Sequence, residues 1–325
     1  MDGAIFLVAA ALSLSSSVVL VARLERLGER LGLAEALLGL VVALAADGPE
    51  IISALTAAAT GQRTVGVGVI LGSNAFNLAA LLGLSALVAG RLRLPRPPVM
   101  LEGTLALAIA FLAVAVVAAS VDAFVGLILA LCVFLPYVLV AALPAASRAR
   151  LPLRRSWLAL LRRAIEQEEA DAQRPLPGDR RDAAMAVLVL VVVVGASVAM
   201  EQSAVTLGTA AGVPAIILGG LVLAAVTSLP NAVAAVYLAR RGRGIAAMSA
   251  AFHSNTFNVL VGLLLPATLV GLGPATREVP VVAMAYLALT VMVVALAWQG
   301  RGLGRRSGVL IIAGYATYVA YLLTM

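Results

Sequence analysis

The sequence predicts an all-α integral membrane protein whose ten transmembrane helices form two inverted repeats of five. Three observations predict this fold. Hydrophobic residues make up 62% of the 325 residues and charged residues only 12%, a balance typical of a membrane protein with many spans. Residues 40–77 recur as residues 221–258, at a constant offset of 181 and without a gap. Arginine is abundant in alternate connections between the apolar runs and nearly absent from the others.

Apolar runs bounded by charged residues, glycine or proline define the spans. They cover residues 4–22, 34–59, 64–90, 97–118, 122–144, 183–201, 212–239, 244–271, 279–299 and 307–324. Each run reaches the roughly 20 residues that a helix needs to cross a bilayer. The first residues carry no positive charge, which favours a retained first helix over a cleaved signal peptide. We therefore expect a first repeat in residues 1–147 and a second in residues 183–325.

Residues 148–182 form the one long polar stretch and are interpreted as a linker between the repeats. Within it, residues 156–169 fit either a short amphipathic helix on the membrane surface or a solvated linker.

The arginines predict how the chain crosses the membrane. All 23 basic residues are arginines, and 21 of them fall in one set of alternate connections, leaving only Arg63 and Arg277 in the other. By the positive-inside rule the larger set is cytoplasmic. We therefore expect an inner (plasma) membrane protein with both termini extracytoplasmic, a cytoplasmic linker and a second repeat inverted relative to the first. The net charge of +7 then encodes orientation rather than a nucleic-acid partner.

Two acids lie in the first copy of the repeated stretch, inside an apolar span. Glu50 and Asp47 are three residues apart, next to Gly48 and Pro49. Acids are costly at membrane depth and usually mark an ion or substrate path, and a proline there frees backbone carbonyls, as in the broken helices of transporters. We expect Glu50 to bind a cation or carry a proton. Asp47 either joins it or caps the second half of the broken helix.

Neutral oxygen donors complete the candidate site. The amides are Asn77, Asn231 and Asn258, and the hydroxyls are Ser73, Thr227, Ser228 and Ser254. Such oxygens suit Na⁺ or Ca²⁺, although hydrogen bonding between helices is their alternative role.

Other titratable residues in the spans have less defined roles. His253, the sole histidine, stands where the first copy has Gly72, and either shuttles protons or makes a structural hydrogen bond. We expect Glu102 and Glu201 near helix ends. The sequence has no metal-type Cys/His cluster, phosphate loop or Ser/His/Asp arrangement, which argues against an enzyme and against a resident cofactor.

The two copies resemble the alpha-repeats of the cation/calcium exchanger superfamily, whose motif reads Gly-Thr-Ser-x-Pro-Glu followed by Gly-Ser-Asn-x-x-Asn or Asp. The matching residues are Pro49, Glu50, Gly72, Ser73, Asn74 and Asn77 in the first copy, and Thr227, Ser228, Pro230, Ser254, Asn255 and Asn258 in the second. The resemblance implies antiport of Ca²⁺ against Na⁺ or H⁺ through a site on the second, third, seventh and eighth helices. Inorganic cations and the lipid bilayer are then its partners.

Departures from this motif leave the transported cation open. Asn231 stands where the family usually has Glu, Asn258 where many members have Asp, and Asp47 where the motif has Ser. The site charge is −1 from Glu50 alone, or −2 with Asp47. A Na⁺/Ca²⁺ or H⁺/Ca²⁺ exchanger is the interpretation that the resemblance favours. A Na⁺ or K⁺/proton antiporter of the same fold, or a membrane sensor or scaffold that does not transport, are the alternatives.

Overall fold

A computed structural model describes residues 2–30, 44, 46–143, 147, 156–171, 178–274, 276–300 and 302–325. Within this part, eight helices are long and apolar enough to cross a membrane, and a bent pair, Ala215–Thr227 with Asn231–Arg240, gives a ninth span. The expected span over residues 34–59 is described mainly in its second half, and residues 34–43 lie outside the described part. The predicted helical membrane fold is confirmed.

The elements follow the expected order. The first half contains α1 (Asp2–Arg30), α3 (Gly48–Ala59), α4 (Arg63–Asn77), the π-helical segment η1 (Leu78–Leu84), α5 (Ser85–Ala89), β1 (Arg91–Arg93), α6 (Arg96–Val117) and α7 (Ala123–Ala141). Helix α9 (Ser156–Asp171) lies in the linker. The second half contains α10 (Arg180–Ala210), α11 (Ala215–Ile217), η2 (Leu218–Leu223), α12 (Ala224–Thr227), α13 (Leu229–Arg240), α14 (Gly244–Phe257), η3 (Asn258–Leu264), α15 (Leu265–Val270), α16 (Glu278–Gly300), β2 (Gly302–Gly304) and α17 (Arg305–Leu323).

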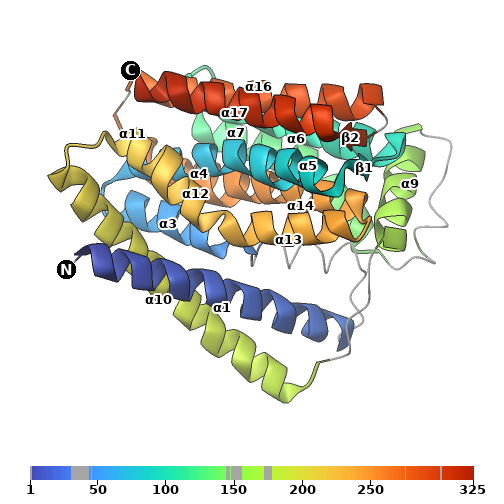
Figure 1. Cartoon of the computed structure of the whole chain (residues 1–325), viewed down its shortest axis with the longest axis horizontal. Coiled ribbons are helices and arrows are strands. Elements are labelled where there is room, and N and C mark those ends of the chain that lie inside the picture. Colours follow the sequence, from blue (N-terminus) through green and yellow to red (C-terminus); the bar gives the residue numbers. More distant parts are fainter. Residues whose placement is uncertain are drawn as a thin grey trace.

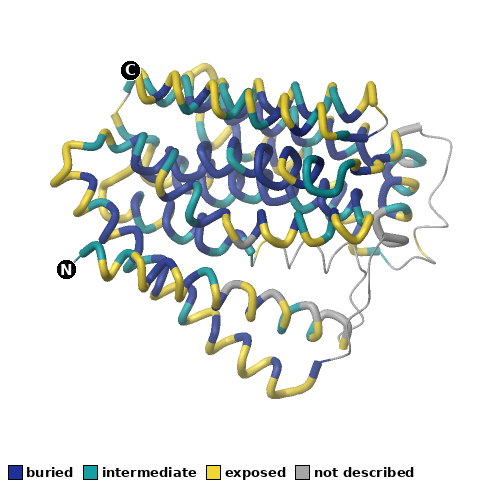
Figure 2. Tube along the Cα trace, viewed as in Figure 1, coloured by how far each residue is buried: buried dark blue, intermediate teal, exposed yellow. Residues whose placement is uncertain are grey.

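The third and eighth spans form the centre of the molecule. Along their most apolar stretches, Arg63–Ala89 is 94% buried and Gly244–Val270 is 78% buried, against 22–56% for the other unbroken spans. In Figure 1, α16 and α17 cover one side of this centre, and α1 and α10 lie together on the opposite side. Exposed residues gather on the outer helices (Figure 2), and many are large and apolar, such as Leu188 and Val191 of α10. Such a surface is suited to lipid.

The two central spans run in opposite directions. Gly244, which begins α14, packs against the backbone of Arg93 in β1, and β1 pairs antiparallel with β2. Arg63, which begins α4, lies instead beside the start of α11 and α16. Figure 1 shows both termini at one end of the molecule and α9, β1 and β2 at the other. This arrangement is that of an inverted repeat.

Glycine allows the seventh span to approach the third. A Cβ atom on Gly72 of α4 would overlap the backbone of Gly220 in η2, and one on Gly219 would overlap the carbonyl of Val65. Only glycine fits where two backbones lie this close. The contact fixes the broken seventh span against the helix that carries Asn74 and Asn77.

Two helices differ from the expected lengths. Helix α10 continues to Ala210, so Glu201 lies well inside it, is 1% exposed and is not near a helix end. A single acid that neighbouring helices cover does not stop an otherwise apolar helix, and the sequence signal for a boundary was therefore misleading. Helix α1 continues past residue 22, where Arg23 forms an ion pair with Asp182 at 2.6 Å.

Residues for which the sequence left a surface helix or a solvated linker open form helix α9, which packs on protein. Leu161, Ala164 and Ile165 are buried, and the helix lies across the end of the bundle in Figure 1, against α6 and α14.

Candidate cation site between the two repeats

Both copies of the repeated stretch contain a helix break at the equivalent residue. Helix α3 begins at Gly48, directly after Asp47, and α13 begins at Leu229, directly after Ser228. A proline follows in each first turn, where its missing N–H costs least and its ring prevents the helix from continuing unbroken. In the second repeat the two halves are bent by 46°. The breaks place polar side chains at the centre of the bundle.

Asp47 bonds to the second repeat rather than to its own helix. Its Oδ1 atom accepts hydrogen bonds from Asn231 Nδ2 at 2.8 Å and from Ser254 Oγ at 2.6 Å. The residue is 0% exposed, and it makes no side-chain capping hydrogen bond although it occupies the N-cap position of α3. The capping role that the sequence left open for Asp47 is therefore wrong.

Glu50 makes the corresponding contact in the other direction. Its Oε1 atom accepts a hydrogen bond from Ser228 Oγ at 2.9 Å, and the residue is 0% exposed. Since the repeats are offset by 181 residues, Glu50 corresponds to Asn231 and Asp47 to Ser228. The Glu50–Ser228 and Asp47–Asn231 contacts are thus equivalent positions in the two repeats.

Four asparagines tie α4 to α14 and η3 with the same symmetry. Asn74 Nδ2 donates to the carbonyl of Asn255 at 3.0 Å, and Asn255 Nδ2 donates to the carbonyl of Asn74 at 3.0 Å. Asn77 Nδ2 donates to Asn255 Oδ1 at 3.1 Å, and Asn258 Nδ2 donates to Asn74 Oδ1 at 3.1 Å. Asn77 Nδ2 also donates to Ser254 Oγ at 3.0 Å, which links this cluster to Asp47.

The cluster uses its donors and leaves oxygen acceptors open. The four oxygens Asp47 Oδ2, Glu50 Oε2, Asn77 Oδ1 and Asn258 Oδ1 are buried, without a hydrogen-bond partner among the described residues. Buried acceptors normally find a partner, so a group of open ones calls for an explanation. Oxygens without competing donors are the ligands that hard cations such as Ca²⁺ and Na⁺ prefer.

Among the described residues, the two carboxyl groups have no basic neighbour that would balance their charge. In the described part of the chain, neither Asp47 nor Glu50 forms an ion pair, and no arginine is buried. The same part holds no group of three or more His, Cys, Asp or Glu residues arranged for a metal. A charge at this depth must therefore be balanced by protons or by a bound cation.

The remaining residues predicted from the sequence are buried, and each directly precedes a member of this cluster along the chain. Ser73 is 0% exposed and its hydroxyl has no partner within the described chain. Thr227 is also buried, but its hydroxyl donates to the Leu223 carbonyl at 2.9 Å, one turn back in the same helix. His253 faces α7, where the rings of Tyr137 and Phe134 lie 5.0 and 6.2 Å from its ring.

Sequence reasoning missed two residues of this hydrogen-bonded cluster and one buried hydroxyl close to Glu50 along α3. Asn74 and Asn255 belonged to the repeated motif, yet no role was assigned to them, and their repetition at the 181-residue offset was the available signal. Ser53 is 0% exposed with an open hydroxyl oxygen. It follows Glu50 by three residues, a spacing that places two side chains on neighbouring positions of a helix.

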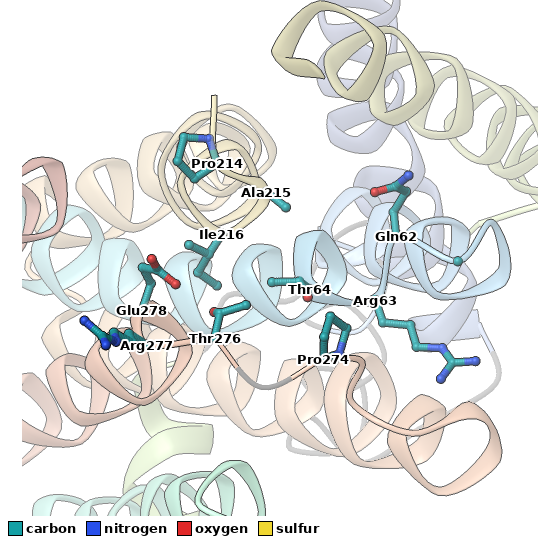
Figure 3. A pocket seen from close by; sticks show the side chains of 11 residues that line it. Gln62, Arg63, Thr64, Pro214, Ala215, Ile216, Pro274, Thr276, Arg277 and Glu278 are labelled. Atoms are coloured by element: carbon teal, nitrogen blue, oxygen red, sulfur yellow. The ribbon is translucent and has the colours of Figure 1, made fainter. Parts of the chain in front are cut away.

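A separate cavity of about 610 Å³ opens at the end of the bundle where α4 and α16 begin (Figure 3). It contains Arg63 and Arg277, and Figure 3 shows the Glu278 side chain beside Ile216 of α11. Asn74 lies eleven residues beyond Arg63 along α4, roughly 16 Å at 1.5 Å per residue. This cavity is therefore not the buried oxygen cluster.

Known proteins share this fold. The match to the structure of the H⁺/Ca²⁺ exchanger CAX covers 99% of this chain and 87% of the CAX chain, with a TM-score of 0.73 and 14% sequence identity. It matches the sodium-calcium exchanger NCX_Mj over 98% of each chain, with a TM-score of 0.60 and 18% identity. These likenesses establish the fold.

Sequence comparison identifies the family. The sodium/potassium/calcium exchanger 4 of Mus musculus is 32% identical over 127 residues, which are 35% of this chain and 20% of that protein. The sodium/potassium/calcium exchanger 3 of Rattus norvegicus is 43% identical over 60 residues, 18% of this chain and 10% of that protein. The alignments thus span a small part of those relatives. The sodium/calcium exchanger protein family matches residues 2–145 and 182–324, and the chain therefore belongs to that family.

Proposed function

We propose that this protein is a secondary-active antiporter that exchanges Ca²⁺ for Na⁺ or H⁺ at the oxygen cluster between its repeats. The open oxygens of Asp47, Glu50, Asn77 and Asn258 carry the proposal. They come from both repeats and are buried. Those of Asp47 and Glu50 lie at the break before α3, and those of Asn77 and Asn258 lie where α4 passes into η1 and α14 into η3. The exchange chemistry of the related proteins, whose names specify sodium, calcium, potassium or protons, agrees with it.

In this proposal each residue type has a distinct task. Glu50 is the central charged ligand, and Ser228 holds one of its oxygens so that the other remains available to the ion. The asparagine amide groups fix their own carbonyl oxygens by donating across the repeat interface. When the cation leaves, protons or Na⁺ balance the carboxylates, and this requirement couples the two fluxes.

The inverted repeat supplies the route for alternating access. Because α4 and α14 run in opposite directions around the site, equivalent movements of the two repeats open it to opposite sides of the membrane. The 21 arginines assign the end with α9 and β1 to the cytoplasm. Under this assignment the cavity at Arg63 and Arg277 is extracytoplasmic.

Flux measurements in proteoliposomes test the function. We expect the parent protein to take up Ca²⁺ when an outward Na⁺ or proton gradient is imposed, and Glu50→Gln to reduce that flux to the level of empty liposomes. The matched control is Asp122→Asn, which neutralises an acid that caps α7 outside the cluster. We expect this control to retain the parent flux.

The same assay separates the alternatives. Exchange of Na⁺ or K⁺ for protons without Ca²⁺ flux would contradict Ca²⁺ transport and favour the monovalent antiporter. Absence of flux for all four ions, with the protein folded and inserted, would contradict transport and favour a sensor or scaffold.

A further inference from the structure

Both carboxylates of the cluster belong to the first repeat. The offset of 181 residues pairs Asp47 with Ser228 and Glu50 with Asn231. The first repeat thus has an acid at both positions, and the second has none. The spatial arrangement of the contacts explains this uneven distribution, and the inference drawn from it rests on the proposed cation site.

In the two equivalent contacts the acid stands at different motif positions, the glutamate position in one and the serine position in the other. In one contact, the serine Ser228 donates to the glutamate Glu50 at 2.9 Å. In the other, the amide Asn231 donates to the aspartate Asp47 at 2.8 Å. Two repeats that both followed the family motif Gly-Thr-Ser-x-Pro-Glu would place a serine and a glutamate in both contacts. Here the second contact has aspartate in the place of the serine and asparagine in the place of the glutamate.

We propose that Asp47 is the second charged cation ligand, and that it replaces, across one hydrogen-bond contact, the carboxylate that the second repeat lacks at Asn231. Asn231 and Ser254 both donate to the Oδ1 atom of Asp47. They hold the carboxylate in place while its Oδ2 atom remains open and buried. The carboxylate is therefore oriented for a ligand rather than bound up by its neighbours.

This replacement determines the class of ion. Asp47 and Glu50 together offer a formal charge of −2, which balances one divalent cation, and the amide oxygens of Asn77 and Asn258 add neutral ligands. Ca²⁺ takes six to eight oxygen ligands, and its affinity depends on how many of them are charged. A site with Glu50 alone would leave a divalent ion half balanced.

Calorimetric titration of the purified protein with Ca²⁺ tests the replacement. Removing one unit charge about 4 Å from the ion should weaken binding by roughly 10²–10³-fold. We therefore expect this loss in both Asp47→Ser and Asp47→Asn, the second of which preserves the size of the side chain. In the double variant Asp47→Ser with Asn231→Glu, the carboxylate returns to the other side of the contact, and we expect Kd within about tenfold of the parent value.

Two results would overturn the proposal. One is an Asp47→Asn variant whose Kd for Ca²⁺ stays within about threefold of the parent value. The other is a double variant that binds no better than Asp47→Ser alone, provided that both unfold at similar temperatures without Ca²⁺. Glu50→Gln, titrated in parallel, distinguishes the two levels of inference. If it abolishes binding while Asp47→Asn does not, only the role of Asp47 fails, whereas a parent that binds Ca²⁺ no better than Glu50→Gln contradicts the cation site itself.

Discussion

At the scale of single residues, the asparagine pairs show how the repeats are joined. Asn74 and Asn255 each donate to the other's backbone carbonyl, and each accepts an amide hydrogen bond from Asn258 or Asn77. Two π-helical segments, η1 and η3, follow this crossing directly, at Leu78 and Asn258. Widened turns of this kind often occur at functional sites. Through Ser254, the crossing also links Asn77 to Asp47.

Asn74→Ala removes one donor and one acceptor of this crossing. Hydrogen bonds between membrane helices are typically worth about 0.6 kcal/mol and up to about 1.7, so we expect a loss of about 1–2 kcal/mol in the free energy of unfolding. Weaker Ca²⁺ binding should accompany it, because Asn258 loses its orienting partner. Steric-trap or denaturant unfolding together with calorimetry measures both effects.

Ser85→Ala is the control for this substitution. Ser85 is 0% exposed and its hydroxyl has no partner in the described part of the chain, so its removal should change neither quantity. Equal effects of the two substitutions would show that Asn74 has no special role.

The pairing of polar residues could be predicted only in part from the sequence. The repeated motif identified Asp47, Glu50, Asn77, Asn231 and Asn258 as candidates, because polar groups are rare in apolar spans. Which acid meets which amide depends on how the repeats cross, and the sequence alone does not specify that. For Thr227 the sequence could not reveal that its hydroxyl bonds to the carbonyl of Leu223 in its own helix, a local competition that threonine often wins.

At the scale of elements, the contact between α4 and η2 holds the broken seventh span in place. Gly72 and Gly219 permit the approach, and Asn74 follows Gly72 by only two residues. The position of this contact therefore controls the geometry of the site.

Gly72→Ala should separate the two elements. A methyl group there overlaps the backbone of Gly220, which cannot move aside as a flexible side chain would. We expect the free energy of unfolding to fall by about 1–3 kcal/mol, as is typical of overpacking, and Ca²⁺ binding to weaken. Gly195→Ala in α10 is the matched control, since nothing lies within 4 Å of the added Cβ atom. A thermal shift that is the same for both variants would contradict this account of the contact.

Helix boundaries show the limit of sequence reasoning at this scale. Spans such as residues 244–271 and 279–299 agree with the observed Gly244–Val270 and Glu278–Gly300, because glycine and charged residues coincide with the ends of their apolar runs. Helix α10 runs beyond the expected residue 201 because packing buries Glu201 within the bundle. Burial of a polar group by neighbouring helices is a tertiary effect that a window of sequence does not contain.

At the scale of the whole molecule, the inverted repeat follows from the duplicated stretch and from the opposite directions of α4 and α14. The predicted fold is confirmed in this respect, whereas the side of the membrane that each end faces remains a prediction. It depends on the division of arginines into 21 and 2.

A reporter fused after Met325 tests the orientation. Alkaline phosphatase, active only outside the cytoplasm, should be active there, and green fluorescent protein at the same position should be dark after export. The same reporters inserted at residue 147, at the start of the linker, should give the opposite pattern. A fluorescent C-terminal fusion would contradict the assignment of the arginine-rich connections to the cytoplasm.

The most direct test of the cation site is to locate the ion itself. Crystals grown with Ca²⁺ and measured for anomalous scattering should show one peak bounded by Asp47, Glu50, Asn77 and Asn258. Oxygen distances of roughly 2.3–2.6 Å are expected for Ca²⁺. A peak at Glu278 in the separate cavity, with the central oxygens unoccupied at saturating Ca²⁺, would contradict the account.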